Sequence, residues 1–135
     1  MNRKPVILYA EDDPDDRELL RETLSRKGFQ HEIVETANGR EALLYLRSTR
    51  SKQNPPVLIL LDLNMPVLNG RETLAIIKSE SDTDSIPVLV FTTSSSPNDQ
   101  EFCKKFDVQM VTKPSTPEEL ELVVSQISGY ISASA

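Results

Sequence analysis

Five short apolar runs, each followed by a segment with helix-start signals, constrain the fold of this chain more than any other feature. Apolar runs of this length are typical of strands buried on both faces of a parallel sheet. They predict strands at 6–10, 32–36, 57–61, 87–91 and 108–112. Because strand and helix signals alternate, we predict an α/β fold: a doubly wound five-stranded parallel sheet with five helices.

Local signals refine this architecture. The run at 32–36 is partly polar, which predicts an edge strand. The polar stretch 48–56 predicts a loop, and the tail 132–135 is expected to fray. Four helices are expected to begin at capping residues, namely Asn38, Asn69, Ser96 and Thr116. In the last helix, apolar residues at helical spacing predict a face turned to the core, formed by Leu120, Val123, Val124 and Ile127.

Length and composition exclude several classes of protein. A chain of 135 residues suits one domain, so we expect a single domain over 1–135, with a core over about 5–130 and no output domain. The net charge of −6 argues against nucleic acid as a direct partner. We expect neither a membrane span nor a signal peptide. The single cysteine, Cys103, fits a reducing cytoplasm, and with only His31 beside it a zinc site is not expected.

Acidic residues follow two of the predicted strands directly. Asp62 comes after the run 57–61, and Glu11 and Asp12 come after the run 6–10. Open α/β sheets bind ligands at the carboxyl ends of their strands, so we expect these acids to converge there. Clustered carboxylates repel one another and raise each other's pKa, a conflict that a hard divalent cation relieves. We therefore predict a Mg²⁺ site at Glu11, Asp12 and Asp62.

Other polar residues near the strand ends divide into cap residues and further site residues. Asp13, Asp15 and Asp16 are interpreted as N-cap and first-turn acids of the first helix, where negative charge suits the helix dipole. Thr92 and Lys113 stand at the ends of the fourth and fifth strands. With the acids they form a set suited to phosphoryl transfer. Asp62 would be the nucleophile, Mg²⁺ and Lys113 would neutralise the phosphoryl oxygens, and Thr92 would hydrogen-bond one of them.

These motifs, in this order, resemble the response regulator receiver domain of two-component signalling over essentially the whole chain. The resemblance rests on Glu11-Asp12, Asp62, Asn64-Met65-Pro66, Asn69-Gly70, Thr92 and Lys113-Pro114. It implies a flavodoxin-like fold and phosphorylation of Asp62 by a sensor histidine kinase or a phosphotransfer protein. It implies Mg²⁺ held by Asp12, Asp62 and the backbone carbonyl of Asn64, with Glu11 acting through water. It also implies that Thr92 moves toward the phosphoryl group while Lys113 pairs with it.

The resemblance extends to partners. The amino-acid sequence around Asp62 and the polar loop before it resemble the corresponding segments of regulators paired with bacterial phytochromes. A phytochrome-type kinase is therefore a candidate partner. The downstream target stays open. Receiver domains often form homodimers through their fourth and fifth helices, which here begin at Ser96 and Thr116. The aromatic residues in that region are candidates for a dimer interface or for the core: Phe102, Phe106 and Tyr130.

A departure from the family pattern at Met110 and two positions that tune phosphate lifetime bear on signalling. Met110 stands where the family usually has an aromatic residue whose rotation accompanies the threonine movement. Methionine is flexible enough to fill the space but cannot place a ring there. The residues two positions after Asp62 and Thr92, which tune attack by water in the family, are Asn64 and Ser94. We predict an acyl phosphate that lasts at least minutes.

Three alternative functions fit the sequence less well. A phosphatase of the haloacid dehalogenase type would need a second acid where Asn64 stands. A receiver-like binding module that works without phosphorylation is the alternative that Met110 keeps open. A flavin-binding module is disfavoured because a cofactor phosphate would face clustered acids rather than backbone amides.

Overall fold

A computed structural model describes residues 4–93 and 96–134 of the chain as one sheet between two layers of helices. The five strands are parallel, in the order β2-β1-β3-β4-β5. They are β1 (Val6–Ala10), β2 (Glu32–Thr36), β3 (Leu58–Leu61), β4 (Val88–Thr92) and β5 (Gln109–Thr112). The described helices are α1 (Pro14–Arg26), α2 (Gly39–Leu46), α3 (Thr49–Gln53), α4 (Gly70–Ser79), α5 (Pro97–Lys105) and α6 (Pro117–Ser134).

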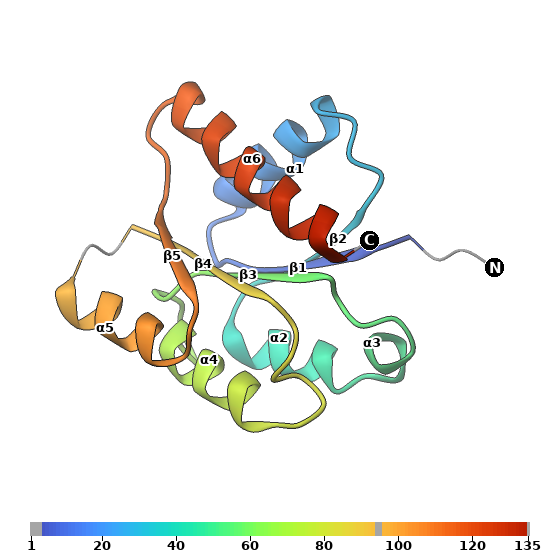
Figure 1. Ribbon diagram of the computed structural model, residues 1–135, viewed down its shortest axis with the longest axis vertical. Coiled ribbons are helices and arrows are strands. Elements are labelled where there is room, and N and C mark those ends of the chain that lie inside the picture. The colour runs from blue at the N-terminus through green and yellow to red at the C-terminus, as the bar shows by residue number, and fades with distance from the viewer. Residues whose placement is uncertain (1–3, 94–95, 135) are drawn as a thin grey trace.

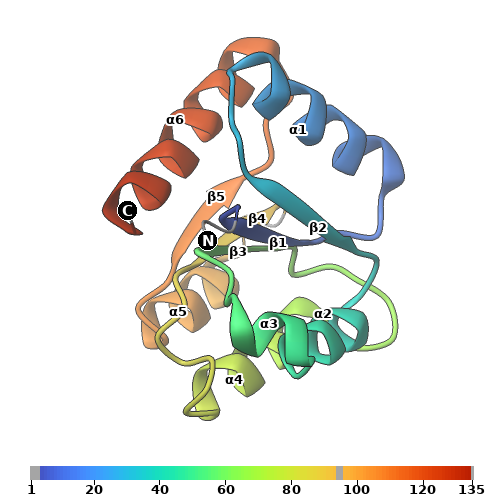
Figure 2. The ribbon, with the colours of Figure 1, turned by 90° about the vertical axis from the view of Figure 1, so that its right-hand side faces the viewer.

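The helices cover both faces of the sheet, as a doubly wound fold requires. Helices α1 and α6 lie on one face, and α2, α3, α4 and α5 lie on the other (Figure 1). Figure 2 shows the same two layers with the sheet between them. The predicted α/β class and the edge position of β2 are confirmed, and each strand lies within one residue of its predicted bounds. Among the described residues, none of the helices has the length and apolar character that a membrane span requires.

One local prediction is wrong. The stretch 48–56 is predicted to be a loop, but it contains the short helix α3, so the described residues hold six helices rather than five. The Ser48 side chain caps this helix by accepting a hydrogen bond from the Ser51 N–H, and Ser51 is buried. The backbone of the tail is helical to Ser134, the last residue of α6, and Ala135 lies outside the described residues.

Side-chain caps start the helices where the sequence predicts them. Asn38, Asn69 and Ser96 are N-caps, and Asn69 forms a full capping box with Glu72. Thr116 accepts a hydrogen bond of 3.1 Å from the Glu119 N–H before α6. These bonds satisfy amide donors that have no partner within the helix. They therefore fix where each helix leaves the carboxyl edge of the sheet.

The core consists of two apolar layers separated by the sheet. Alternate residues of β1 face opposite layers: Ile7 and Tyr9 pack toward α1 and α6, whereas Leu8 and Ala10 pack toward the other helices. The predicted apolar face of α6 is confirmed as part of the first layer, through Leu120, Val123, Val124 and Ile127. With both faces covered, β1 and β3 form a rigid base beneath the residues that follow them.

Gly70 begins α4 where the chain passes very close to the end of β3. Its N–H donates a 3.0 Å hydrogen bond to the Leu63 carbonyl oxygen. A Cβ at this position would lie 2.1 Å from the carbonyl oxygen of Asp62 and 2.5 Å from the Cα of Leu63. Only glycine fits without a backbone shift, so the close approach holds the loop after Asp62 in place.

We expect Gly70→Ala to lower the free energy of unfolding by about 2–4 kcal/mol, because the backbone atoms that its Cβ meets cannot move aside cheaply. Gly129→Ala is the matched control, since a Cβ there has nothing within 4 Å and the residue lies within α6. The control should raise stability by about 0.5–1 kcal/mol. Urea unfolding of both variants checks this, and equal effects would contradict it.

Candidate functional site

Three acids predicted to converge do meet at the carboxyl edge of the sheet. In the register of the parallel pair, Ala10 lies opposite Leu61, so Glu11 and Asp62 leave neighbouring strands at the same level. The Asp62 N–H donates a 3.1 Å hydrogen bond to the Ala10 carbonyl oxygen. One carboxylate oxygen each from Glu11, Asp12 and Asp62 lies within 4.8 Å of the others. Oxygen donors at this spacing suit a hard divalent cation.

Lys113 places its ammonium among these acids. Its Nζ forms ion pairs with Glu11, with Asp62 Oδ2 at 3.2 Å and with Asp16 Oδ2 at 3.0 Å. Burial on its own would lower the pKa of Lys113, but the hydrogen bonds to Glu11 and Asp16 and the charge of Asp62 raise it overall. The amine therefore stays protonated and acts as a fixed positive charge.

Glu11 is the most deeply buried acid of the site, with a side chain fully shielded from solvent. Burial raises the pKa of Glu11 to about 7, and the negative charge of Asp62 acts in the same direction. Contact with Lys113 and a 3.2 Å hydrogen bond from the Asp13 N–H oppose that rise. The predicted upward shift is thus present at Glu11, with desolvation as its main cause rather than repulsion between acids.

Thr92 and Asn64, two further predicted site residues, are held by backbone hydrogen bonds at the ends of β4 and β3. Thr92 is fully buried at the end of β4, and its carbonyl oxygen accepts a 2.8 Å hydrogen bond from the Lys113 N–H. The Asn64 N–H donates to Asp62 Oδ1 at 3.2 Å, so the loop folds back over the carboxylate. Ser94, the other residue linked to phosphoryl lifetime, lies outside the described residues.

Asp16 reaches the site, although its sequence position suggests only a helix-end role. As expected, Asp13 is the N-cap of α1, with its side chain accepting a 2.9 Å hydrogen bond from the Asp15 N–H. Asp16 belongs to the first turn of this helix, as predicted, but its carboxylate also pairs with Lys113. The available signal was that α1 starts at the same strand end as Glu11 and Asp12.

Arg71 is a second residue that the sequence reasoning missed. Its guanidinium makes two parallel hydrogen bonds of 2.6 Å each to the carboxylate of Asp99, which is buried in the first turn of α5. Its Nη1 also lies 3.5 Å from the Leu63 carbonyl oxygen. Arg71 thus joins the loop after Asp62 to the helix that follows Thr92. A bidentate pair of this kind fixes geometry as well as charge.

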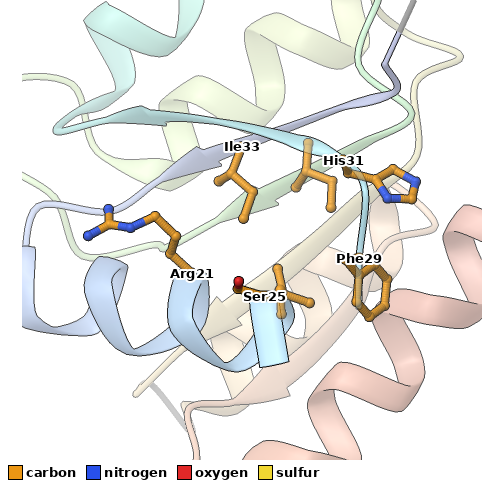
Figure 3. Close-up of a pocket in the computed structure, with 7 residues that line it drawn as sticks. Arg21, Ser25, Phe29, His31 and Ile33 are labelled. Atoms are coloured by element: carbon orange, nitrogen blue, oxygen red, sulfur yellow. The ribbon is translucent and has the colours of Figure 1, made fainter. Parts of the chain in front are cut away.

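A separate cavity of about 250 Å³ lies between α1 and β2 (Figure 3). It is lined by Ile7, Arg21, Leu24, Ser25, Phe29, His31 and Ile33. Arg21 already pairs with Glu35 at 2.5 Å, and the ring of His31 contacts Phe29 at a centroid distance of 5.7 Å. The cavity is built on the first half of β1, away from the strand ends that carry the acids.

Comparison with known proteins identifies the family. The family model described as the response regulator receiver domain matches residues 7–125. This chain belongs to the response regulator receiver domain family. Receiver domains are signalling proteins of two-component systems rather than conventional enzymes, and accepting phosphoryl groups from histidine kinases is their general role.

The relatives of this receiver domain include regulators paired with phytochromes. Response regulator Rcp1 from Synechocystis sp. is 41% identical over 67 residues, 48% of this chain and 46% of Rcp1, so the matched segment spans about half of that relative. The structure of the phosphorylated cyanobacterial phytochrome response regulator RcpA is similar with a TM-score of 0.86, at 34% identity, covering 98% of this chain and 97% of that one. The Mn²⁺-bound form of Rcp1 has a TM-score of 0.80 at 36% identity over 91% of each chain.

Met110, where the family resemblance implies an aromatic residue, lies in β5. It pairs with Val90 across the sheet and packs, half-buried, against the same core layer as Phe102 and Phe106. The rings of Phe102 and Phe106 contact each other at a centroid distance of 5.1 Å. Tyr130 packs against the other layer, and its hydroxyl lies 3.2 Å from Gln109 Oε1. All three aromatic residues are therefore partly buried rather than free on the surface.

The raised pKa of Glu11 predicts a pH dependence for this receiver domain without metal. The ordinary pKa of this carboxyl is 4.5, and burial raises it to about 7 in the folded state, so the folded protein binds this proton more tightly. The free energy of unfolding should therefore fall, by about 1–3 kcal/mol, as pH rises through that window. Urea unfolding in EDTA at pH 5 and pH 8 tests this, and Glu11→Gln should lack that part of the fall. Equal pH profiles for the two proteins would contradict the prediction.

Proposed function

We propose that this receiver domain accepts a phosphoryl group on Asp62 from the phosphohistidine of a sensor histidine kinase or a phosphotransfer protein, and signals by changing conformation. The observation that carries the proposal is the position of Asp62. It follows a buried strand, 3.2 Å from the Lys113 ammonium, with Glu11 and Asp12 oxygens within 4.8 Å. A carboxylate held in this way can act as a nucleophile while neighbouring positive charge stabilises the transferred group.

In the proposed transfer, a carboxylate oxygen of Asp62 forms a bond to phosphorus as the bond from phosphorus to the histidine nitrogen breaks. The imidazole of the partner leaves with that electron pair. Lys113 pairs with a phosphoryl oxygen, and the Thr92 hydroxyl hydrogen-bonds another after moving toward it. The product is an acyl phosphate at the end of β3, directly before the loop that Gly70 holds in place.

Mg²⁺ is the proposed cofactor, because the donor set consists of oxygens and the acids exceed the single lysine in charge. Asp12, Asp62 and the backbone carbonyl of Asn64 would hold it, with Glu11 acting through water. When bound, the ion would neutralise charge on the phosphoryl oxygens. The relative Rcp1, whose structure is known in a Mn²⁺-bound form, supports a divalent ion of this kind.

Similarity to RcpA and Rcp1 supports a phytochrome-type kinase as the partner. We place the protein in the cytoplasm, where its lone buried thiol, Cys103, fits reducing conditions. The charge of −6 supports a protein rather than a nucleic acid as the downstream target. We also propose that a homodimer, where one forms, pairs through α5 and α6.

A receiver-like binding module that needs no phosphorylation is the second candidate. The observation in its favour is Met110, because a half-buried methionine cannot perform the aromatic rotation that the family uses. The complete set of site residues around Asp62 favours phosphorylation instead.

Phosphorylation is tested with a small phosphodonor and Mg²⁺, followed by intact-protein mass measurement. We expect the wild type to gain the mass of one phosphoryl group and Asp62→Asn to gain none, because the nucleophilic oxygen is lost. Asp82→Asn, a substitution of the same kind at an exposed position, should behave as wild type. No gain in the wild type would favour the binding module, and steady turnover of phosphate esters would favour a phosphatase.

The lifetime of the acyl phosphate is a separate prediction. The amide of Asn64 cannot act as a general base, so it should not activate an attacking water molecule as a carboxylate would. We expect phosphate to remain on Asp62 for minutes or longer after removal of the phosphodonor, and Asn64→Glu to shorten that time. Loss within a few seconds in the wild type would contradict this expectation.

A further inference from the structure

Lys113 forms ion pairs with three carboxylates that differ in burial. Glu11 and Asp62 are buried and belong to the proposed metal set, whereas the Asp16 side chain is 38% exposed. Within the described residues, Asp16 is not part of the group of acids whose oxygens lie within 4.8 Å of one another. Two of the lysine's partners would therefore also face the metal, and the third would not.

The first turn of α1 is tied to the strand ends, so the Asp16 carboxylate stands at a set position. Asp13 caps the helix and Pro14 is its first residue. The next residue after Asp16, Arg17, donates a 2.5 Å hydrogen bond to the Glu11 carbonyl oxygen and lies 3.4 Å from Glu35. These contacts hold the first turn of α1 in place, and in this turn the Asp16 carboxylate lies 3.0 Å from the Lys113 ammonium.

A divalent ion held by Asp12 and Asp62, and through water by Glu11, would compete with the ammonium for the oxygens of Asp62 and Glu11. The ammonium then needs another acceptor close enough to keep it beside Asp62. Asp16 meets this need, because it is 3.0 Å from Nζ and is solvated enough to hold a charge at low cost. Without it, the acids that pair with the lysine among the described residues would be Glu11 and Asp62 alone, and the lysine would oppose the metal more strongly.

We propose that Asp16 is a positioning residue that holds the Lys113 ammonium beside Asp62 while a divalent cation is bound at the acid cluster of Glu11, Asp12 and Asp62. The inference rests on the proposed function, since it assumes that the acid cluster binds Mg²⁺. Asp16 itself would touch neither the metal nor the phosphoryl group. It acts through Lys113 alone.

The experiment measures the dissociation constant for Mg²⁺ by calorimetry in the wild type and in single and double variants. We expect Asp16→Asn to weaken Mg²⁺ binding about fivefold, the size typical of a partly exposed ion pair. Asp15→Asn is the matched control, because it removes the same charge from the same turn at an exposed position. It should weaken binding by less than about twofold through long-range charge alone.

The Lys113→Met background separates positioning from simple charge. There, Asp16→Asn and Asp15→Asn should have equal small effects, because no ammonium remains to be held. A full fivefold effect of Asp16→Asn in that background, or equal effects of the two substitutions with Lys113 present, would overturn the inference. Thermal unfolding in EDTA establishes that each variant is folded. If the wild type binds no Mg²⁺, the metal-dependent function fails first, and with it this role for Asp16.

Discussion

The carboxyl edge of the sheet depends on one ammonium group placed between three carboxylates. Lys113 leaves the end of β5 and reaches across the end of β4 to acids at β1 and β3. Two of those acids, Glu11 and Asp62, are buried, and a buried charge that loses its partner costs about 3–5 kcal/mol. The lysine is therefore the internal counter-charge that allows the acids to share one edge of the folded protein.

This arrangement links stability to ligand chemistry. The ammonium supplies one positive charge to a cluster that holds more than one negative charge, and Glu11 responds with a pKa raised to about 7. In the proposed function, a divalent cation would add positive charge to the same cluster of oxygens. A transferred phosphoryl group would add negative charge at Asp62, which would call for both the cation and the lysine. The excess of negative charge, which lowers the stability of the metal-free site, thus suits the site to bind a cation and, with it, the anionic phosphoryl group.

The sequence predicts most of this site because its signals are local. Buried apolar runs locate the strands, and parallel register then brings their final residues together, as Ala10 opposite Leu61 illustrates. Contacts that depend on how each helix is rotated and placed against the sheet could not be predicted from the sequence. The direction of Asp16 depends on the rotation of α1 against the sheet, and Arg71 meets Asp99 across 28 positions without any spacing signal. Helix α3 escaped prediction because a single serine cap and a buried Ser51 define it.

The Arg71–Asp99 ion pair would constrain how the proposed movement of Thr92 is transmitted to α5. Helix α5 follows the segment after Thr92, while Arg71 sits one residue into α4, directly after the loop that carries Asp62. Two hydrogen bonds of 2.6 Å fix Asp99 in direction as well as distance. Met110, by contrast, is unbranched and can adopt several rotamers within the same core layer. A large displacement of α5 relative to the Asp62 loop would therefore break this ion pair, whereas the methionine can adjust without resisting it.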